Sequence, residues 1–226
     1  MGAGGRSVVD ELARRVAPTG HVLGTDLDLT WAEPPSVDAD GEVGEGAAVE
    51  LRRHDVVSDT LPEGSFDLVH ARLLLVHLPE REAVVGRLAS SLRPGGFLFL
   101  EDADPALQPL SCIDPAGRPG ELANEIRQGF RALLAGRGAD LSFGRRLPRL
   151  LRDAGLAEVE ADAYLPVAMA ECVPLELATL ELIAHELLAN RIVTRAELDE
   201  HRANVTGGLV DLSQPPMISA WGRRPS

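Results

Sequence analysis

Short apolar runs alternate with stretches of helical periodicity through the first two-thirds of the chain. Apolar residues spaced three and four positions apart predict amphipathic helices over 6–17 and 80–92. The apolar runs between and around them predict four strands: 21–26, 48–53, 66–71 and 97–100. Strands that alternate with helices in this way are typical of parallel βα units, so we expect an α/β fold.

The last third of the chain is less regular and mixes helices with two further strands. The same spacing rules predict four helices and two strands there: helices over 120–135, 145–154, 174–189 and 194–204, and strands over 157–164 and 217–221. The segment 174–189 is apolar almost all round, which predicts a helix that is either buried or self-associating, as in a homodimer. Residues 34–47 and the proline-rich stretch 103–120 are predicted to be loops.

Composition and charge narrow the classes of protein that fit this pattern. The 226 residues carry a net charge of −13, which argues against a general nucleic-acid or anionic-membrane binder. No apolar run approaches the roughly 18 residues that span a bilayer, and no secretory leader opens the chain, so we expect a soluble, cytoplasmic protein. Cys112 and Cys172 lack metal-ligand spacing and are expected to be reduced, partly buried thiols, and the six histidines form no metal-binding pair. We therefore expect no metal site.

A glycine cluster and an acidic residue mark the first candidate site. Residues 2–5, Gly-Ala-Gly-Gly, directly precede a predicted helix, whose free N–H groups can face an anionic group. Asp26 ends the first predicted strand, 22 residues after Gly4. An acid at that position can accept hydrogen bonds from both hydroxyls of a ribose. A glycine cluster alone can be a simple turn, but the two features together indicate a cofactor that contains a nucleoside.

Three motifs further along indicate which cofactor. The sequences LPEGSFDLV (61–69), HARLLLVHLP (70–79) and LRPGG (92–96) follow one another, and their order resembles the class I S-adenosylmethionine-dependent methyltransferases of the small-molecule type. The resemblance implies a doubly wound, mostly parallel, Rossmann-like sheet with a helical cap insertion. It also implies transfer of a methyl group from S-adenosylmethionine to O, N or C of a small-molecule acceptor, mainly by proximity and orientation. The alternative is a non-catalytic, methyltransferase-like interaction protein, with a dinucleotide oxidoreductase as a third hypothesis.

The same resemblance implies roles for individual residues in the cofactor site. The glycine loop lines the methionine end, while the acid after the first strand holds the ribose and its neighbour packs on the adenine. The residues after the second strand flank the adenine, and those at the end of the third border the sulfonium centre. In that order, the implied residues are Gly2, Ala3 and Gly4; Asp26 and Leu27; Asp55 and Val56; His70, Ala71 and Arg72.

Several of these residues have a second interpretation. Asp55 could cap a turn, and His70 and Arg72 could be ordinary polar residues at a strand end. His77 is the best-placed candidate for a general base, which the reaction needs only when the acceptor must lose a proton. It could instead shape the turn that follows. His185 is a second candidate, with a packed core histidine as its alternative.

The resemblance also implies how the chain is organised and where it departs from the family. We expect a cofactor-binding core at 1–164, a helical cap over the active site at 165–212, and a terminal strand that completes the sheet at 213–226. The family places an inner strand directly before the glycine loop, where this sequence has Met1, and a third glycine where it has Arg6. A sheet without that strand leaves two neighbours with unpaired backbone groups. Either the recorded start omits a segment, or the chain is a truncated product that binds cofactor poorly or completes its sheet with a partner.

Overall fold

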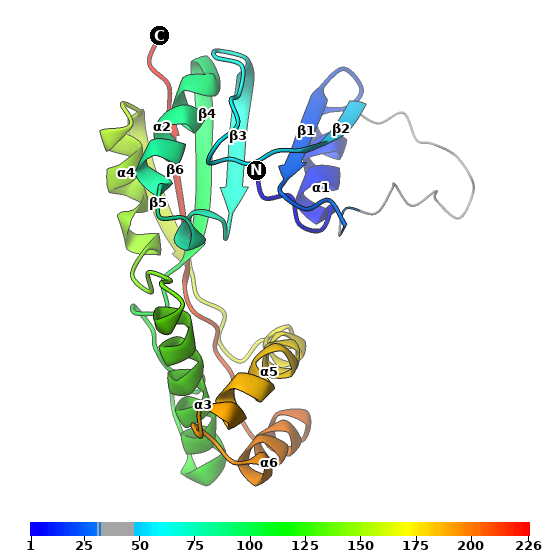
Figure 1. The fold of residues 1–226 in the computed structure, drawn as a ribbon, viewed down its shortest axis with the longest axis vertical. Helices are drawn as coiled ribbons and strands as arrows, with labels where there is room; N and C mark the ends of the chain where they lie inside the picture. The colour runs from blue at the N-terminus through cyan, green and yellow to red at the C-terminus, as the bar shows by residue number, and fades with distance from the viewer. Residues whose placement is uncertain (31, 33–47) are drawn as a thin grey trace, which may run out of the picture. The chain divides into compact units, whose positions relative to one another are not determined.

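The computed structural model describes residues 1–30, 32 and 48–226, so the predicted loop at 34–47 lies outside the described residues (Figure 1). The chain forms two compact units. The first unit comprises Met1–Leu100, Leu150–Val159 and Trp221–Ser226, and the second comprises Glu101–Arg149 and Glu160–Ala220. The expected division into core, cap and terminal strand stays a prediction, because compact units do not define functional ones.

The first unit begins with a helix packed on a pair of parallel strands. Its elements are α1 (Ser7–Val16), β1 (His21–Asp26), β2 (Ala48–Arg53), β3 (Phe66–Arg72), a 3₁₀ turn (Leu75–His77) and α2 (Arg81–Ser91). β1 and β2 are parallel, with His21 opposite Ala48 and Asp26 opposite Arg53. At Gly24 a Cβ atom would lie 2.7 Å from Leu51. Glycine therefore permits close packing in this layer.

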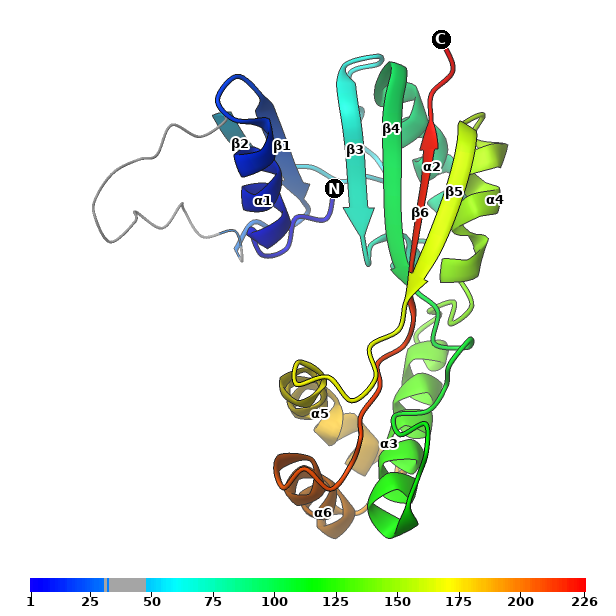
Figure 2. The ribbon, with the colours of Figure 1, turned by 180° about the vertical axis from the view of Figure 1, so that it is seen from behind.

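The second sheet has four strands in the order β3-β4-β6-β5. Its remaining strands are β4 (Leu92–Ala103), β5 (Ala157–Tyr164) and β6 (Met217–Arg223). Three of the four strands run the same way, and β6 runs against them (Figure 2). This mostly parallel sheet flanked by helices confirms the predicted α/β, Rossmann-like class.

β4 begins five residues earlier than the predicted strand 97–100, and this part of the prediction was wrong. The Pro-Gly-Gly sequence at 94–96 lies within the strand. The N–H of Gly95 donates to the carbonyl of Arg224 (2.9 Å), and the N–H of Arg224 donates to the carbonyl of Gly96 (2.8 Å). Pairing with a distant segment thus overrides the local turn signal.

β1 and β3 are both edge strands. β1 ends the two-stranded sheet and β3 ends the four-stranded one, and in the described part of the chain no strand pairs with the second side of either.

The second unit is held together by three helices: α3 (Gly117–Gly136), α5 (Cys172–Ala189) and α6 (Arg195–Thr206). Their apolar faces meet in one core: Leu122, Ile126, Leu180, Ile183, Leu187, Val193 and Leu198. α5 is buried along one face only, since Leu182 is 81% exposed. The remaining helical segments are a 3₁₀ turn (Gly144–Arg146) and α4 (Leu147–Asp153), of which α4 spans both units.

Two further expectations concern thiols and membranes. Cys112 and Cys172 are both free and buried, as expected of reduced structural thiols. Burial raises the pKa of the Cys112 thiol, so it is a poor nucleophile at neutral pH. Among the described helices, none has the length and apolarity needed to cross a membrane.

Candidate cofactor site

The glycine loop bonds directly to the end of β1. The N–H of Gly4 donates to Oδ2 of Asp26 (2.8 Å), and the N–H of Ala3 donates to the carbonyl of Thr25 (2.9 Å). Gly2 and Gly4 have φ angles of +66° and +46°, which glycine adopts without strain. The sequence pair predicted to form one site, loop and acid, is therefore in contact.

Arg6 takes the place of the family's third glycine without distorting the backbone. Its φ of −73° is ordinary helical geometry, so no glycine is needed there. The Arg6 guanidinium forms an ion pair with Asp10 (2.8 Å) one turn further along α1. This departure from the family pattern is accommodated locally.

The Asp26 carboxylate has acceptor capacity left for a ligand. Oδ2 accepts from Gly4, and Oδ1 accepts the N–H of Asp28 (3.1 Å). A carboxylate offers about four lone-pair sites, so two remain for ribose hydroxyls. The neighbouring Leu27 side chain is 59% exposed, and Nε of Arg53 holds its carbonyl (3.2 Å). Leu27 thus has an apolar surface free to pack on a flat ring.

Asp55 follows β2 near the end of β1, but its carboxylate accepts hydrogen bonds from residues of its own turn. The N–H of His54 donates to the Asp26 carbonyl (2.9 Å), which brings the end of β2 to the end of β1. The Asp55 carboxylate accepts the N–H of Val57 (2.8 Å) and the hydroxyl of Ser58 (3.0 Å). The bond from Val57, foremost, holds the pKa of Asp55 below its usual range. Asp55 therefore caps a turn, the second interpretation of its sequence, and its role at the adenine stays a prediction.

Arg87, which the sequence did not indicate, stabilises that turn through hydrogen bonds to its backbone. Its guanidinium donates to the carbonyls of Val56 (2.8 Å) and Val57 (2.7 Å) from α2. The helix was predictable, but its partners lie about 30 residues earlier in the chain, and no local pattern points to them. Arg87 therefore positions Val56.

The end of β3 is joined to the glycine loop and to two aromatic residues. The Met1 ammonium donates to the His70 carbonyl (2.8 Å). The His70 ring stacks on Phe99, with centroids 5.6 Å apart, and Phe99 stacks on Trp221 at 6.0 Å. This aromatic row, which was not predicted, fixes the His70 side chain on one face of the sheet.

The other predicted site residues differ in their exposure to solvent. Ala71 is buried, whereas Arg72 is exposed. His77 is exposed in the 3₁₀ turn after β3, and within the described residues no hydrogen bond or ion pair joins it to the loop or to Asp26. His185 is exposed on α5, so its interpretation as a packed core histidine was wrong.

A cavity of about 760 Å³ lies within the first unit. α1 and β1 line one part of it, β3 lines another, and Met1, Gly2 and Ala3 line its end. Arg72 reaches it, whereas Asp26, Asp55 and His77 are not among the lining residues. Over the described ranges, no group of three or more His, Cys, Asp or Glu residues is placed to hold a metal ion.

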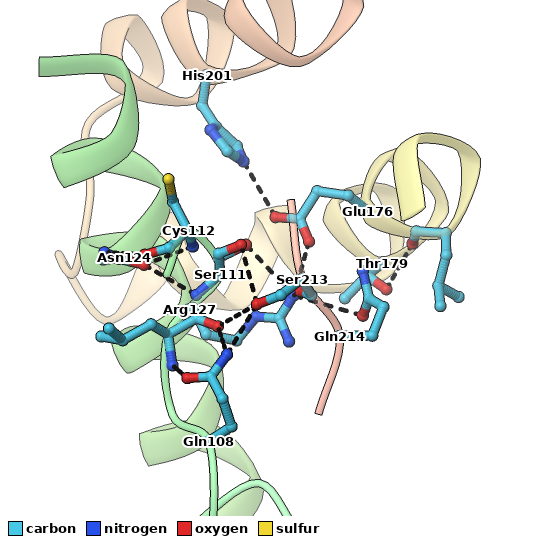
Figure 3. Close-up of polar contacts among 12 residues, drawn as sticks. Gln108, Ser111, Cys112, Asn124, Arg127, Glu176, Thr179, His201, Ser213 and Gln214 are labelled. Carbon is cyan, nitrogen blue, oxygen red and sulfur yellow. Dashed lines mark hydrogen bonds and ion pairs between the residues drawn. The ribbon is translucent and has the colours of Figure 1, made fainter. Parts of the chain in front are cut away.

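A second polar cluster, also missed from sequence, lies buried in the second unit (Figure 3). Arg127 of α3 donates to Glu176 of α5 (3.0 Å), whose other oxygen lies 3.0 Å from Nε2 of His201 of α6. Burial alone would raise the pKa of Glu176, but the bond to His201 and the charge of Arg127 hold it below its usual range. The three side chains are almost inaccessible to solvent, so the cluster joins three helices and offers no surface to a ligand.

A known protein family matches the first part of the chain. Residues 1–100 match the family described as "Methyltransferase domain". Phosphoethanolamine N-methyltransferase of Triticum aestivum is 27% identical over 168 residues, covering 73% of this chain and 30% of that protein. Nocamycin O-methyltransferase of Saccharothrix syringae is 35% identical over 100 residues, covering 44% and 35%. The chain thus spans about a third of the length of these relatives.

A solved structure supports the fold over the whole chain. The arsenic(III) S-adenosylmethionine methyltransferase of Chlamydomonas reinhardtii matches with a TM-score of 0.51 and 17% identity, covering 100% of this chain and 62% of that one. At this identity the likeness shows the fold alone. Residues 1–100 thus match a methyltransferase domain in sequence, and the chain shares the Rossmann-like fold of this solved structure.

Proposed function

We propose that the protein transfers a methyl group from S-adenosylmethionine to an O, N or C atom of a small-molecule acceptor. The hydrogen bond between Gly4 and Asp26 carries the proposal, because it joins a glycine loop before a helix N-terminus to an acid that is suited to accept from ribose hydroxyls. The family match over residues 1–100 supports it.

The residues at the ends of three strands fit the parts of this cofactor. The glycine loop leaves backbone N–H groups at the start of α1 for the methionine carboxylate. Asp26 accepts from the ribose, and Leu27 and Val56 pack on the adenine. His70 and Arg72 border the reacting end, where Arg72 can neutralise a carboxylate of cofactor or substrate.

The chain itself has little chemistry to perform. Bound S-adenosylmethionine supplies a methyl group already activated by the sulfonium, so alignment and the exclusion of water account for most of the rate. Where the acceptor must lose a proton, His77 is the proposed general base, since it is exposed and lies in the 3₁₀ turn that follows β3.

Titration calorimetry with the full chain tests this function. We expect S-adenosylmethionine and its demethylated product to bind one per chain, and NAD not to bind. Transfer of a labelled methyl group to a panel of small amines, alcohols and phosphoethanolamine then identifies the acceptor class. A chain that is folded by circular dichroism but binds neither cofactor form would refute the proposal.

A non-catalytic interaction protein is the second candidate, and one observation favours it. Leu182 of α5 is 81% exposed, and a large apolar side chain in water is a typical contact for a partner. A folded chain that self-associates through α5 and binds no cofactor would support this alternative.

A further inference from the structure

The turn that follows β3 exposes an apolar side chain, that of Leu73, in a backbone conformation that leucine rarely adopts. We propose that Leu73 contacts the methyl acceptor and selects an apolar small molecule over a polar one such as phosphoethanolamine. The inference rests on the proposed function, because it names the class of acceptor for that site. Its support comes from the backbone, the exposure and the neighbours of Leu73.

The backbone of Leu73 lies in the left-handed region, with a φ angle of +51°. Bulky side chains are rare there, because the Cβ atom comes too close to the following carbonyl oxygen. Arg191 has a similar φ of +54°, but it directly follows the end of α5, where a left-handed residue commonly terminates a helix. Leu73 follows a strand and terminates no helix. Strain of this kind persists only where the surroundings impose it, and it is concentrated at ligand sites.

The exposure of Leu73 is not shared by the whole turn. Leu75 and Val76, two and three positions later, are buried in the core, whereas Leu73 is 44% exposed. The turn therefore has a buried side that receives its other apolar residues. Exposure alone is ordinary for a leucine, but exposure together with an unfavourable backbone indicates a contact that a ligand completes.

The neighbours of Leu73 support a position beside the proposed reacting end of the cofactor. A Cβ atom on Gly2 would lie 3.4 Å from the side chain of Leu74, so the turn packs against the glycine loop. Leu73 also lines the same cavity as Gly2, Ala3 and Arg72. In α/β proteins, ligands bind beyond the carboxyl ends of the parallel strands, and Leu73 directly follows that end of β3.

The chemistry of the leucine side chain defines the class of acceptor. Leu73 has no polar side-chain atom, so its side chain can recognise an acceptor only through apolar contact. An aromatic or aliphatic body that covers it removes apolar surface from water on both partners. A charged acceptor group would lose hydrogen bonds to water at the same place without replacing them. Leu73 therefore favours an apolar acceptor over phosphoethanolamine.

Calorimetry on the full chain, saturated with S-adenosylhomocysteine, tests this choice of acceptor. The apolar probes are 2-naphthol and 1-naphthylamine, which carry a hydroxyl and an amine on the same fused ring, and phosphoethanolamine is the polar probe. We expect both apolar probes to bind with a Kd at least about tenfold lower than that of phosphoethanolamine. Transfer of a labelled methyl group from S-adenosylmethionine should follow the same order.

Variants of Leu73 show whether this residue makes the contact. Leu73→Asn removes the apolar surface and suits the left-handed backbone, so the Kd of 2-naphthol should rise about tenfold while the melting temperature does not fall. Leu73→Met keeps an apolar side chain of similar volume and should change that Kd by no more than about threefold. Leu209→Asn is the matched control, because Leu209 is an exposed leucine of the second unit and should leave the Kd unchanged.

Several results would overturn the inference. Phosphoethanolamine could bind as tightly as the naphthalene probes, or Leu73→Asn could leave the Kd of 2-naphthol unchanged. Leu209→Asn could raise that Kd as much as Leu73→Asn does. A lower melting temperature together with the higher Kd in Leu73→Asn would make Leu73 a packing residue instead.

Binding of the cofactor separates this inference from the proposed function. We expect the Kd for S-adenosylmethionine to be the same in the native chain and in all three variants. A chain that binds S-adenosylmethionine but prefers phosphoethanolamine would refute the choice of acceptor and leave the proposed function standing. A folded chain that binds no cofactor would refute both.

Discussion

Gly4 and Asp26 are bonded backbone to carboxylate across 2.8 Å, although 22 residues separate them in the chain. The bond fixes the loop before α1 to the end of β1 before any ligand arrives. Preorganisation of this kind lowers the entropy that a ligand must lose when it orders its site.

Replacing Asp26 should weaken the binding of S-adenosylmethionine. Asp26→Ala removes the acceptor proposed for the ribose and releases Gly4, so we expect the Kd to rise about tenfold to a hundredfold. Titration calorimetry measures the change, with Glu11→Gln on the exposed side of α1 as the control. An unchanged Kd for Asp26→Ala would remove this residue from the site.

Arg87 should act on affinity through the turn that it holds. Arg87→Ala frees the carbonyls of Val56 and Val57, and we expect the Kd for S-adenosylmethionine to rise about threefold to tenfold. The Kd of Arg87→Lys, which can still donate to one carbonyl, should lie between those of the native chain and Arg87→Ala. Glu82→Ala on the exposed part of α2 serves as the control, and an equal loss in that variant would indicate a general effect on the helix.

The buried polar cluster of the second unit should contribute to the free energy of unfolding. Glu176→Gln leaves Arg127 without its buried counter-ion, so we expect a loss of about 3–5 kcal/mol in the free energy of unfolding. The control lies on the same helix: Glu186 pairs with Arg137 at the surface, and Glu186→Gln should cost no more than about 1 kcal/mol. Denaturant unfolding followed by circular dichroism compares them, and similar losses for both variants would contradict the prediction.

The stability of the second unit should therefore decrease at acidic pH because of the same cluster. The pKa of Glu176 is below its ordinary value of 4.5, so its contribution is complete above that pH and is lost as the pH falls through the folded-state pKa. The stability difference between the native chain and Glu176→Gln should therefore shrink on acidification. Denaturant unfolding between pH 7 and pH 3 measures it, and a constant difference would mean that Glu176 does not titrate in this window.

His77 should affect turnover but not cofactor binding. For an acceptor that loses a proton, His77→Gln should lower kcat about a hundredfold or more. The Kd for S-adenosylmethionine should stay unchanged. His185→Gln, on α5, is the matched control, and a kcat that falls equally in both variants would argue against a specific base.

Periodicity located the elements well because each helix or strand carries its own signal. The boundaries that shifted are those set by distant partners. β4 extends through Pro94 because Gly95 and Gly96 pair with Arg224, and no window around residue 95 contains that information. α3 begins at Gly117, earlier than predicted, with Pro119 in its first turn, where its missing N–H costs no helical bond.

In the candidate site, too, residues within one local segment could be predicted and residues that depend on distant partners could not. Gly4 and Asp26 were predictable because loop, helix and strand follow one another in the chain. Arg87, Phe99 and Trp221 were not, since each acts on a segment at least 29 residues away. The Arg127–Glu176–His201 cluster was missed for a related reason: charged residues on amphipathic helices normally face water, and only the packing of three helices buries these.

The place of β6 in the sheet also bears on how fast the protein can fold. β4 and β6 are neighbours, yet about 110 residues lie between them, and the helices α3, α5 and α6 all belong to that interval. Closing so long a loop is slow when the chain is disordered, and it becomes easier once the interval has condensed. The second unit can therefore act as a folding aid that draws the two strands together. Variants that weaken its helices should therefore retard the refolding of the sheet.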